Sequence, residues 1–252
     1  MNNLKFSIVT ICFNSEKTIA DTIDSVQKQD YDNIEHIIVD GLSTDSTLNI
    51  VKSKQNNQMV WISEKDFGLY DALNKGIKMC TGDIIGVLHS DDHLAHPQVI
   101  SDLSKLFELH ADIDAVSASV EIYKQNQNQK PYRVYDASKF REWQFRMGIQ
   151  PPHPGFYIRK TAHERVGYYN SAYKISGDFD WLLRVIIKEK LNVLYSKYVA
   201  VHMLDGGVSS SGFNSKKQMN KENLRILKSH KIYSNLFIIY LKYFLKIFQL
   251  RF

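Results

Sequence analysis

Two adjacent carboxylates, Asp91 and Asp92, close a mostly apolar run in the segment "DIIGVLHSDDHLAHP" at residues 83–97. Neighbouring like charges repel and are costly to remove from water, so a stable fold must compensate them. Water, a helix N-terminus or a cation could do this. Hard cations such as Mg²⁺ and Mn²⁺ prefer carboxylate oxygens, which makes the pair a candidate metal site. A helix-capping acidic turn is the alternative.

The first half of the chain predicts the elements that would position this pair. Short apolar, β-rich runs alternate with stretches of helical spacing. The predicted strands cover residues 6–11, 36–40, 60–63 and 83–88, and Pro97 opens a helix that reaches about Leu109. Strands separated by helices of this length indicate the α/β fold class, with right-handed crossovers on a Rossmann-like, mostly parallel sheet.

Sheets of this kind bind ligands at the carboxyl ends of their strands. Polar residues follow each predicted strand at this edge: Asn14, Asp40, Glu64 and the Asp91–Asp92 pair. The sequence therefore predicts a polar site along one edge of the sheet. Ser43 or Thr44 is expected to cap the helix that comes after Asp40.

The second half is less regular. It predicts a short strand within residues 153–160, a helix over 178–189 with acidic residues in its first turn, and a β-rich run over 192–203. The loop "GGVSSSG" then precedes two C-terminal helical segments. We expect a catalytic domain over residues 1–212 and a C-terminal helical extension over 213–252.

Bulk composition limits the function classes. The 252 residues are 44% hydrophobic and 23% charged, which is ordinary for a globular chain. The net charge of +5 is compatible with a phosphorylated substrate or an anionic membrane surface, and is too weak to indicate nucleic acid. Cys12 and Cys80 fit no disulfide framework or metal-ligand spacing, so we expect buried free thiols and a cytoplasmic location. The N-terminus lacks the pattern of a signal peptide.

Four sequence motifs in a fixed order resemble those of the inverting nucleotide-sugar glycosyltransferases of family 2, whose fold is called GT-A. They are "SIVTICFNSEKTIADTIDSVQKQ", "IIVDGLSTDST", "EKDFGLYDALNKGIKMCTGDIIGVLHSDD" and "SGDFDWLLR", and the resemblance spans about residues 5–210. It implies transfer of a sugar from a nucleotide-diphosphate sugar to a hydroxyl group. A divalent cation, Mn²⁺ or Mg²⁺, would neutralise the charge on the leaving diphosphate.

The resemblance implies roles for residues of the first half. Asp92 would ligate the metal, and Asp91 would hold the ribose or a metal-bound water. Asp40 would accept hydrogen bonds from the nucleobase, as an ionised carboxylate can, or would be only a turn residue before Gly41. The other nucleotide-binding candidates are Thr10 and Phe13, expected to line the base pocket, and Asp71 and Asn74, which could equally face solvent on an amphipathic helix.

The catalytic base is expected within "SGDFDW". An acceptor hydroxyl has a pKa far above 7, so a carboxylate must take its proton as the new C–O bond forms. Members of the family commonly carry a Glu-Asp pair here. Gly177 stands at the glutamate position, which leaves Asp178 as the expected base and Asp180 as the second candidate. Both could instead be favourable first-turn charges on the helix dipole.

Two histidines are further candidates. The resemblance places His153 near the acceptor or the diphosphate. His202 could be a third metal ligand or could touch the diphosphate, because imidazole is an acceptable ligand for Mn²⁺. Each could equally be a hydrogen-bonded structural histidine. His89 stands where relatives more often carry asparagine, so its role is open.

The C-terminal segment over residues 230–252 is apolar and aromatic. Its polar residues fall on one narrow stripe of a helix and leave a broad apolar face: Lys231, Asn235, Lys242, Lys246 and Gln249. Two central lysines argue against a membrane-spanning helix and favour a helix lying in the membrane plane. A helix packed on the catalytic domain or on a partner subunit is the alternative.

These expectations describe a cytoplasmic enzyme of polysaccharide biosynthesis, peripheral on the inner face of the membrane. Its partners would be a nucleotide-sugar donor and a saccharide acceptor in lipid-linked form, with no nucleic acid. Two other functions stay open. A nucleotidyltransferase would share the sheet and the metal, but "CFNSEKT" is not the glycine-rich, basic phosphate loop that it would usually carry. A non-catalytic relative would bind the nucleotide sugar or scaffold a synthesis complex.

Overall fold

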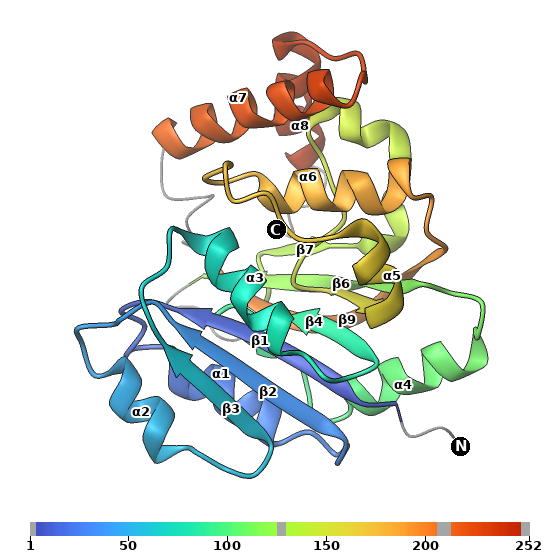
Figure 1. Cartoon of the computed structure of the whole chain (residues 1–252). Coiled ribbons are helices and arrows are strands. Elements are labelled where there is room, and N and C mark those ends of the chain that lie inside the picture. Colours follow the sequence, from blue (N-terminus) through green and yellow to red (C-terminus); the bar gives the residue numbers. More distant parts are fainter. Residues whose placement is uncertain (1–3, 125–129, 206–212, 248–252) are drawn as a thin grey trace.

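The computed structural model describes residues 4–124, 130–205 and 213–247 (Figure 1). In this part of the chain one sheet has the strand order β3-β2-β1-β4-β8-β6-β9-β5, and β7 pairs with β6 beside it. The strands are β1 (Phe6–Cys12), β2 (Ile34–Asp40), β3 (Met59–Ser63), β4 (Ile84–Val87), β5 (Asp92–Leu94), β6 (Ala115–Tyr123), β7 (Arg133–Tyr135), β8 (Phe156–Arg159) and β9 (Val193–Leu204).

Helices cover both faces of this sheet. The α-helices are α1 (Ile19–Gln27), α2 (Thr47–Ser53), α3 (Leu69–Met79), α4 (Val99–Leu109), α5 (Lys160–Val166), α6 (Gly177–Leu183), α7 (Phe213–Ser229) and α8 (Leu236–Ile247). Short 3₁₀ turns form η1 (Ala137–Lys139) and η2 (Glu142–Met147), and a π-helical turn, η3 (Arg184–Lys188), continues α6.

The first half of the sheet is parallel, as its alternating strands and helices predict. β1 pairs in parallel with β2 and β4, and β2 pairs in parallel with β3. Beyond β4 the sheet is mixed, because β8 runs antiparallel to β4 and β6 while β9 runs parallel to β6. β5 closes the order as an antiparallel partner of β9, a strand that the sequence does not predict.

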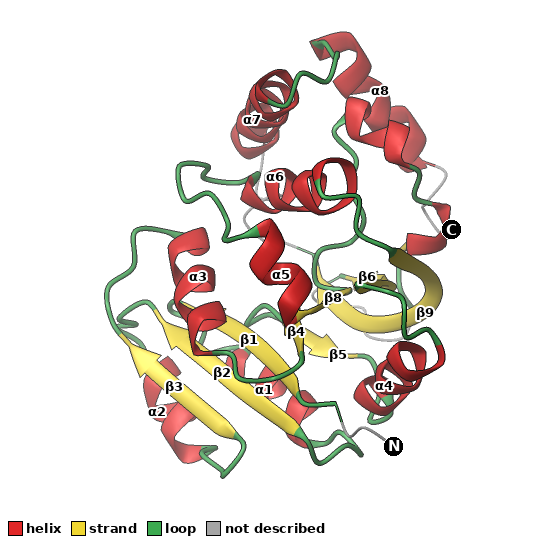
Figure 2. Cartoon of the chain, turned by 45° about the vertical axis from the view of Figure 1, so that its right-hand side comes forward, coloured by secondary structure: helices red, strands yellow, loops and turns green. Residues whose placement is uncertain are grey.

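Alternate residues of the central strands enter different layers of the core. Val9 of β1 and Ile37 of β2 pack with Leu73 of α3 on one face. Ile38 of β2 packs with Ile23 of α1 on the other face. Figure 2 shows α3 on one side of these strands and α1 and α2 on the other. Strands buried on both faces in this way need the continuous apolar runs seen in the sequence.

Hydrogen bonds join the loops at the carboxyl ends of β1, β2 and β4. The Asn14 amide donates to Ser43 Oγ at 2.8 Å, and the hydroxyls of Ser15 and Ser90 lie 2.9 Å apart. The expectation that Ser43 or Thr44 caps the next helix is wrong, because α2 begins at Thr47 and no side chain caps it. Ser43 Oγ donates instead to the Asp40 carboxylate. These bonds fix the edge of the sheet at which the polar residues gather.

The C-terminal helices pack on α6 and η2, away from β2 and β3 (Figure 1). Ile239 and Lys242 of α8 are buried at 0% and 1% exposure, so part of the predicted polar stripe faces inward. Apolar residues of α8 are exposed instead: Leu236, Phe237, Tyr240 and Leu241. Gln249 and the segment 206–212 lie outside the described residues. None of the helices in the described ranges combines the length and the apolarity needed to cross a membrane.

Candidate active site

The Asp91–Asp92 pair lies at the carboxyl edge of the sheet, where β4 leads into β5. Asp92 is the first residue of β5 and is only 2% exposed. Among the described residues neither of its carboxylate oxygens has a hydrogen-bond partner, although the Leu204 amide lies near enough to favour the charged form. Burial and the neighbouring Asp91 charge raise the pKa of Asp92 well above its ordinary value.

A buried carboxylate of this kind has to bind either a proton or a cation. A divalent cation fits, because it prefers carboxylate ligands and Asp91 supplies a second one. Within residues 4–124, 130–205 and 213–247, no group of three or more His, Cys, Asp and Glu side chains could hold a metal ion. A cation bound by two carboxylates could take its remaining ligands from the phosphate oxygens of a bound nucleotide.

Asp178 lies in the first turn of α6 and is partly buried. Its carboxylate accepts hydrogen bonds from the Tyr70 hydroxyl at 3.2 Å, the Gln150 side-chain amide at 2.5 Å and the Phe179 backbone amide at 2.9 Å. Burial raises the pKa of Asp178 above its ordinary value, against the lowering effect of these donors. A carboxylate with a raised pKa, held in place by three donors, is suited to general-base chemistry.

His89 connects the two acidic groups. Burial lowers the pKa of His89, while the charges of Asp91 and Asp178 both act in the opposite direction. Its imidazole ring lies 6.0 Å from the ring of His153, measured between centroids. The charges of Asp91 and Asp178 thus both act on a histidine whose role the sequence left open.

His153 belongs to an aromatic cluster behind His89. It is 6% exposed, and its Nε2 lies 2.8 Å from the Tyr169 hydroxyl. Burial lowers the pKa of His153 to about 3, so the ring is neutral at physiological pH. The Tyr169 ring in turn stacks on Tyr70, which donates to Asp178. His153 supports the site through this cluster, and its direct contact with acceptor or diphosphate stays a prediction.

Phe13 and Asp66 flank Gly41 at the ends of β1 and β2. Phe13 is 60% exposed. A Cβ atom on Gly41 would collide with the Asp66 carboxylate and come within 3.5 Å of the Phe13 ring, so glycine leaves both side chains in place. The Gly68 amide fixes Asp66 from the other side at 2.9 Å. An exposed ring beside a carboxylate suits a nucleobase, the ring for stacking and the carboxylate for its N–H groups.

Asp40 is the buried neighbour of Gly41, at 1% exposure. Its carboxylate accepts from the Ser43 hydroxyl at 2.5 Å and from the Ser63 hydroxyl at 2.6 Å. These serines come from the loop after β2 and from the end of β3. Asp40 therefore joins the loop after β2 to the end of β3, and its direct contact with the base stays a prediction.

The side chains of Thr10 and Asn74 also form hydrogen bonds within the fold. Thr10 is fully buried, with its hydroxyl 2.9 Å from Nε2 of His36. Asn74 donates to the Tyr169 carbonyl and accepts from the Tyr169 amide, both at 2.9 Å. Both side chains thus stabilise the surroundings of the site, and their predicted contacts with the nucleotide are not tested by these bonds.

Asp71 and Lys75 hold the loop that carries Asp66. The Asp71 carboxylate accepts from the Phe67 amide at 3.0 Å and lies 3.5 Å from Lys75 Nζ. Lys75 Nζ also lies 2.9 Å from the Glu64 carboxylate and donates to a carbonyl of the same loop. Lys75 therefore has a structural task that its place on an amphipathic helix does not reveal.

His202 is not brought to the Asp pair. The β5–β9 ladder pairs Asp92 with Met203 and His93 with His202. Successive residues of a strand point to opposite faces, so His202 shares its face with His93 and not with Asp92. Its Nε2 lies 3.4 Å from Glu121, and burial lowers its pKa. Its role as a metal ligand or a diphosphate contact stays a prediction.

Asp180, the second candidate base, is 5% exposed and already paired. Its carboxylate accepts from Arg184 Nε at 3.1 Å and lies 3.0 Å from His230 Nε2. Arg184 also donates to the carbonyls of Val166 and Tyr168. Asp180 thus ties α6 to the end of α7, which leaves Asp178 as the acid of this motif that faces the site.

Tyr70 and Gln150 contact the candidate base Asp178, and the sequence analysis identified neither of them. A Cβ atom at Gly177 would come within 2.7 Å of the Tyr70 ring. The tyrosine ring therefore occupies the space that a larger residue at position 177 would need. No local signal could reveal this, because Tyr70 and Asp178 are 108 positions apart. Asp66 could have been found, since it follows a predicted strand at the ligand-binding edge.

Comparison with known sequences identifies a family. The sequence model described as Glycosyl transferase family 2 matches residues 7–167. An uncharacterized glycosyltransferase of Mycobacterium tuberculosis is 28% identical over 183 residues, which cover 72% of this chain and 68% of that protein. A PGL/p-HBAD biosynthesis glycosyltransferase of Mycobacterium bovis is 26% identical over 210 residues, which cover 82% of this chain and 79% of that protein.

Solved structures show a similar fold. TarS 1–349 of S. aureus in complex with UDP-GlcNAc superposes with a TM-score of 0.64 at 21% identity, covering 88% of this chain and 67% of that chain. The mannosyltransferase PcManGT of Pyrobaculum calidifontis, in complex with GDP-Man and Mn²⁺, superposes with a TM-score of 0.63 at 16% identity. This match covers 88% of this chain and 64% of that chain. This chain therefore spans about two thirds of the length of these solved chains. The expected GT-A fold is confirmed.

Proposed function

This chain belongs to glycosyltransferase family 2, and from that premise we propose that it moves a glycosyl group from a nucleoside-diphosphate sugar to a saccharide hydroxyl, with inversion at the anomeric carbon. The observation that carries the proposal is the buried Asp92 carboxylate beside Asp91, and the action of both the Asp91 and the Asp178 charge on His89 supports a shared site. Glycosyl transfer needs charge compensation at the leaving diphosphate and a base at the acceptor hydroxyl. The bound UDP-GlcNAc and GDP-Man of two proteins with this fold support a nucleotide sugar as donor.

The donor would bind along the carboxyl edge of the sheet. Asp92 and Asp91 would hold a divalent cation, Mn²⁺ or Mg²⁺, whose charge stabilises the leaving diphosphate when it is bound. The Mn²⁺ in the PcManGT complex supports this choice of metal. Phe13 would stack on the nucleobase, and Asp66 would accept from its N–H groups. Asp40 keeps the loop that carries Gly41 in the conformation that this contact needs.

Asp178 would act at the acceptor. It removes the proton of the attacking hydroxyl while that oxygen forms its bond to the anomeric carbon. The bond between this carbon and the diphosphate oxygen breaks on the opposite face, and its electron pair leaves with the diphosphate. Gln150 and Tyr70 orient the carboxylate through their hydrogen bonds. Neutral His153 adds no positive charge that would weaken the base.

A panel of nucleotide sugars tests the donor site. In the presence of Mn²⁺, one nucleotide class should protect the protein from thermal unfolding and serve as donor. Phe13→Ala should weaken binding of that nucleotide about 5- to 150-fold, because stacking on an aromatic ring is worth ~1–3 kcal/mol. The melting temperature should not fall, since the ring is 60% exposed.

Val60→Ala is the matched control for Phe13→Ala. Val60 is 48% exposed and lies near the start of β3, at the opposite end from the site. This variant should bind the nucleotide as wild type does. Equal protection of the Phe13→Ala variant and the wild type would show that the base binds elsewhere.

The acceptor, in our proposal, is a lipid-linked saccharide that the enzyme meets at the inner face of a membrane. The exposed apolar side of α8 supports this, with Leu236, Phe237, Tyr240 and Leu241 between 41% and 74% exposed. These positions share one side of the helix, whereas Ile239 and Lys242 face the protein. Arg146 lies over the neighbouring Tyr233 ring at 5.7 Å and adds positive charge. Apolar and aromatic side chains beside cations are typical of helices that lie in an anionic membrane surface.

Vesicle sedimentation tests the membrane contact. Wild type should sediment with phosphatidylcholine vesicles containing phosphatidylglycerol. The double variant Phe237→Glu/Leu241→Glu should bind them at least about 100-fold more weakly, because burying each apolar side chain is worth ~1.5–3 kcal/mol. Leu109→Glu is the control, since Leu109 is 76% exposed but lies on α4. Undiminished binding by the double variant would refute the α8 contact.

A further inference from the structure

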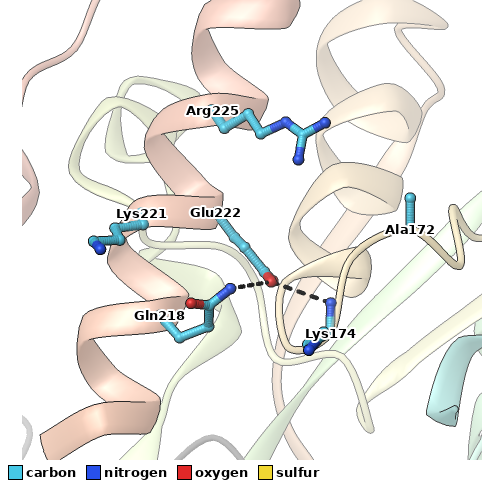
Figure 3. Close-up of a pocket in the computed structure, with 6 residues that line it drawn as sticks. All are labelled: Ala172, Lys174, Gln218, Lys221, Glu222 and Arg225. Atoms are coloured by element: carbon cyan, nitrogen blue, oxygen red, sulfur yellow. Dashed lines mark hydrogen bonds between the residues drawn. The ribbon is translucent and has the colours of Figure 1, made fainter.

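The C-terminal helix α7 contributes a buried carboxylate to the segment that precedes α6. Glu222 is 7% exposed. It accepts hydrogen bonds from three consecutive backbone amides, those of Lys174 at 3.2 Å, Ile175 at 3.0 Å and Ser176 at 2.9 Å. The Gln218 side chain donates to it at 2.8 Å, and Figure 3 shows the carboxylate between Gln218 and the Lys174 amide.

These bonds keep Glu222 charged and the segment rigid. Although burial alone would raise its pKa, the donors lower the pKa of Glu222 below its ordinary value. Moving the segment away would leave the buried Glu222 charge without its hydrogen-bond partners, which is energetically costly. The carboxylate therefore holds the three amides in place. The N-cap residue of α6, Ser176, forms no side-chain cap, so α7 fixes the start of α6.

The same segment is held from its other side by the catalytic centre. The Tyr70 hydroxyl donates to the Ile175 carbonyl at 2.6 Å and to the Asp178 carboxylate at 3.2 Å. Residues 174–176 therefore lie between Glu222 of α7 and Tyr70 of α3. Asp178 follows Ser176 by two positions, so any shift of this segment moves the proposed base.

We propose that Glu222 is a positioning residue for Asp178, through which the C-terminal extension completes the active site. This inference rests on the proposed function of Asp178 as the base. Glu222 lies beyond the residues that match the family's sequence model, so its role cannot be taken from that match. It makes α7 part of the catalytic unit, in contrast to a separate extension that begins at residue 213.

Kinetics of the full-length Glu222→Gln variant test this inference. Glutamine has nearly the same shape, and Glu222 borders a cavity of about 340 Å³, so the substitution removes charge without steric conflict. The substitution should lower kcat about 10- to 100-fold, as expected when a catalytic group is displaced by about 1 Å, with the donor KM unchanged within twofold. Glu222→Asp keeps the charge but shortens the side chain, so its kcat should lie between those of Glu222→Gln and the wild type.

Two further readouts separate positioning from general stability. Amide hydrogen exchange should accelerate at residues 174–178 in Glu222→Gln and stay unchanged in β1–β4. The acid limb of the kcat profile should move to lower pH, because a displaced Asp178 is less buried. The titratable groups around Asp178, namely His89, Tyr70, Tyr135 and Tyr169, are unchanged in this variant. Lys221→Gln is the control, since its side chain points away from Glu222 in Figure 3.

Wild-type kcat in Glu222→Gln, or in Glu222→Asp if the first variant does not fold, would overturn the inference. A fall in kcat with an unchanged pH profile and unchanged exchange at residues 174–178 would also overturn it. Asp178→Asn distinguishes this failure from failure of the proposed function. If Asp178→Asn abolishes transfer while Glu222→Gln does not reduce it, only the positioning role of Glu222 is lost.

Discussion

Replacing Asp178 with asparagine is expected to reduce sugar transfer about 10³-fold, while nucleotide binding stays within twofold of wild type. Asparagine keeps the shape of the side chain and can still accept from Tyr70, but it cannot take a proton. Because burial raises the pKa of Asp178, the wild-type rate should fall as the pH drops through a value above the ordinary carboxyl range. This acid limb should be missing from the residual activity of the variant.

Asp180→Asn is the matched control, two residues further along α6. Asp180 is paired with Arg184 and His230, so its neutralisation should cost about 1–3 kcal/mol of stability and leave the acid limb in place. Full activity in Asp178→Asn would remove Asp178 from the mechanism. If the wild type transfers sugar from no donor while it still binds nucleotides, a scaffold role becomes the better account.

Replacing Asp92 with asparagine should have opposite effects on the metal-free and metal-bound protein. Asp92 is a buried acid for which the described residues offer no hydrogen-bond partner. The pKa of Asp92 is raised in the folded state. The contribution of Asp92 to the stability of the fold is therefore fully present at low pH and is lost as the pH rises through the pKa of the folded state. Without metal, Asp92→Asn should therefore be as stable as wild type at neutral pH, or more stable. Stabilisation by Mn²⁺ should disappear.

Glu35→Gln provides the contrast for Asp92→Asn. Glu35 is also buried, but hydrogen bonds from Lys5, Ser7 and Thr81 overcome the effect of burial and lower its pKa to about 2. Its stabilising contribution is present above the unfolded pKa and is lost only as the pH falls through about 2. The free energy of unfolding of Glu35→Gln should therefore be about 1–3 kcal/mol lower than that of the wild type at neutral pH. A similar loss in Asp92→Asn would indicate a structural cap instead of a metal ligand.

Local pattern was enough to predict the first half of the fold and the edge that carries the site. Buried parallel strands require continuous apolar runs, and β1 to β4 have them. Phe13 is an exposed ring and Asp178 a partly buried acid, and the roles that the motifs imply for them stay predictions. In the same region, Thr10 proved to be buried against His36, because the sheet is covered on both faces.

Contacts between distant segments could not be predicted from one sequence. The bonds from Tyr70 and Gln150 to Asp178, and from the Ser176 amide to Glu222, depend on how α3, α6 and α7 pack. Which side of α8 packs against the protein could not be predicted either. Its periodicity shows a polar stripe and an apolar face, but tertiary packing buries Lys242 and exposes Phe237.

The most direct test of the cation site is calorimetric titration of the wild type and the Asp91→Asn/Asp92→Asn variant with UDP and GDP, in Mn²⁺ and in EDTA. We expect one nucleotide to bind the wild type at least about tenfold more tightly in Mn²⁺ than in EDTA, because the ion offsets the charge of the diphosphate. The variant should bind weakly in both buffers. Equal affinity in all four combinations of protein and buffer would contradict the assignment of this pair to a metal.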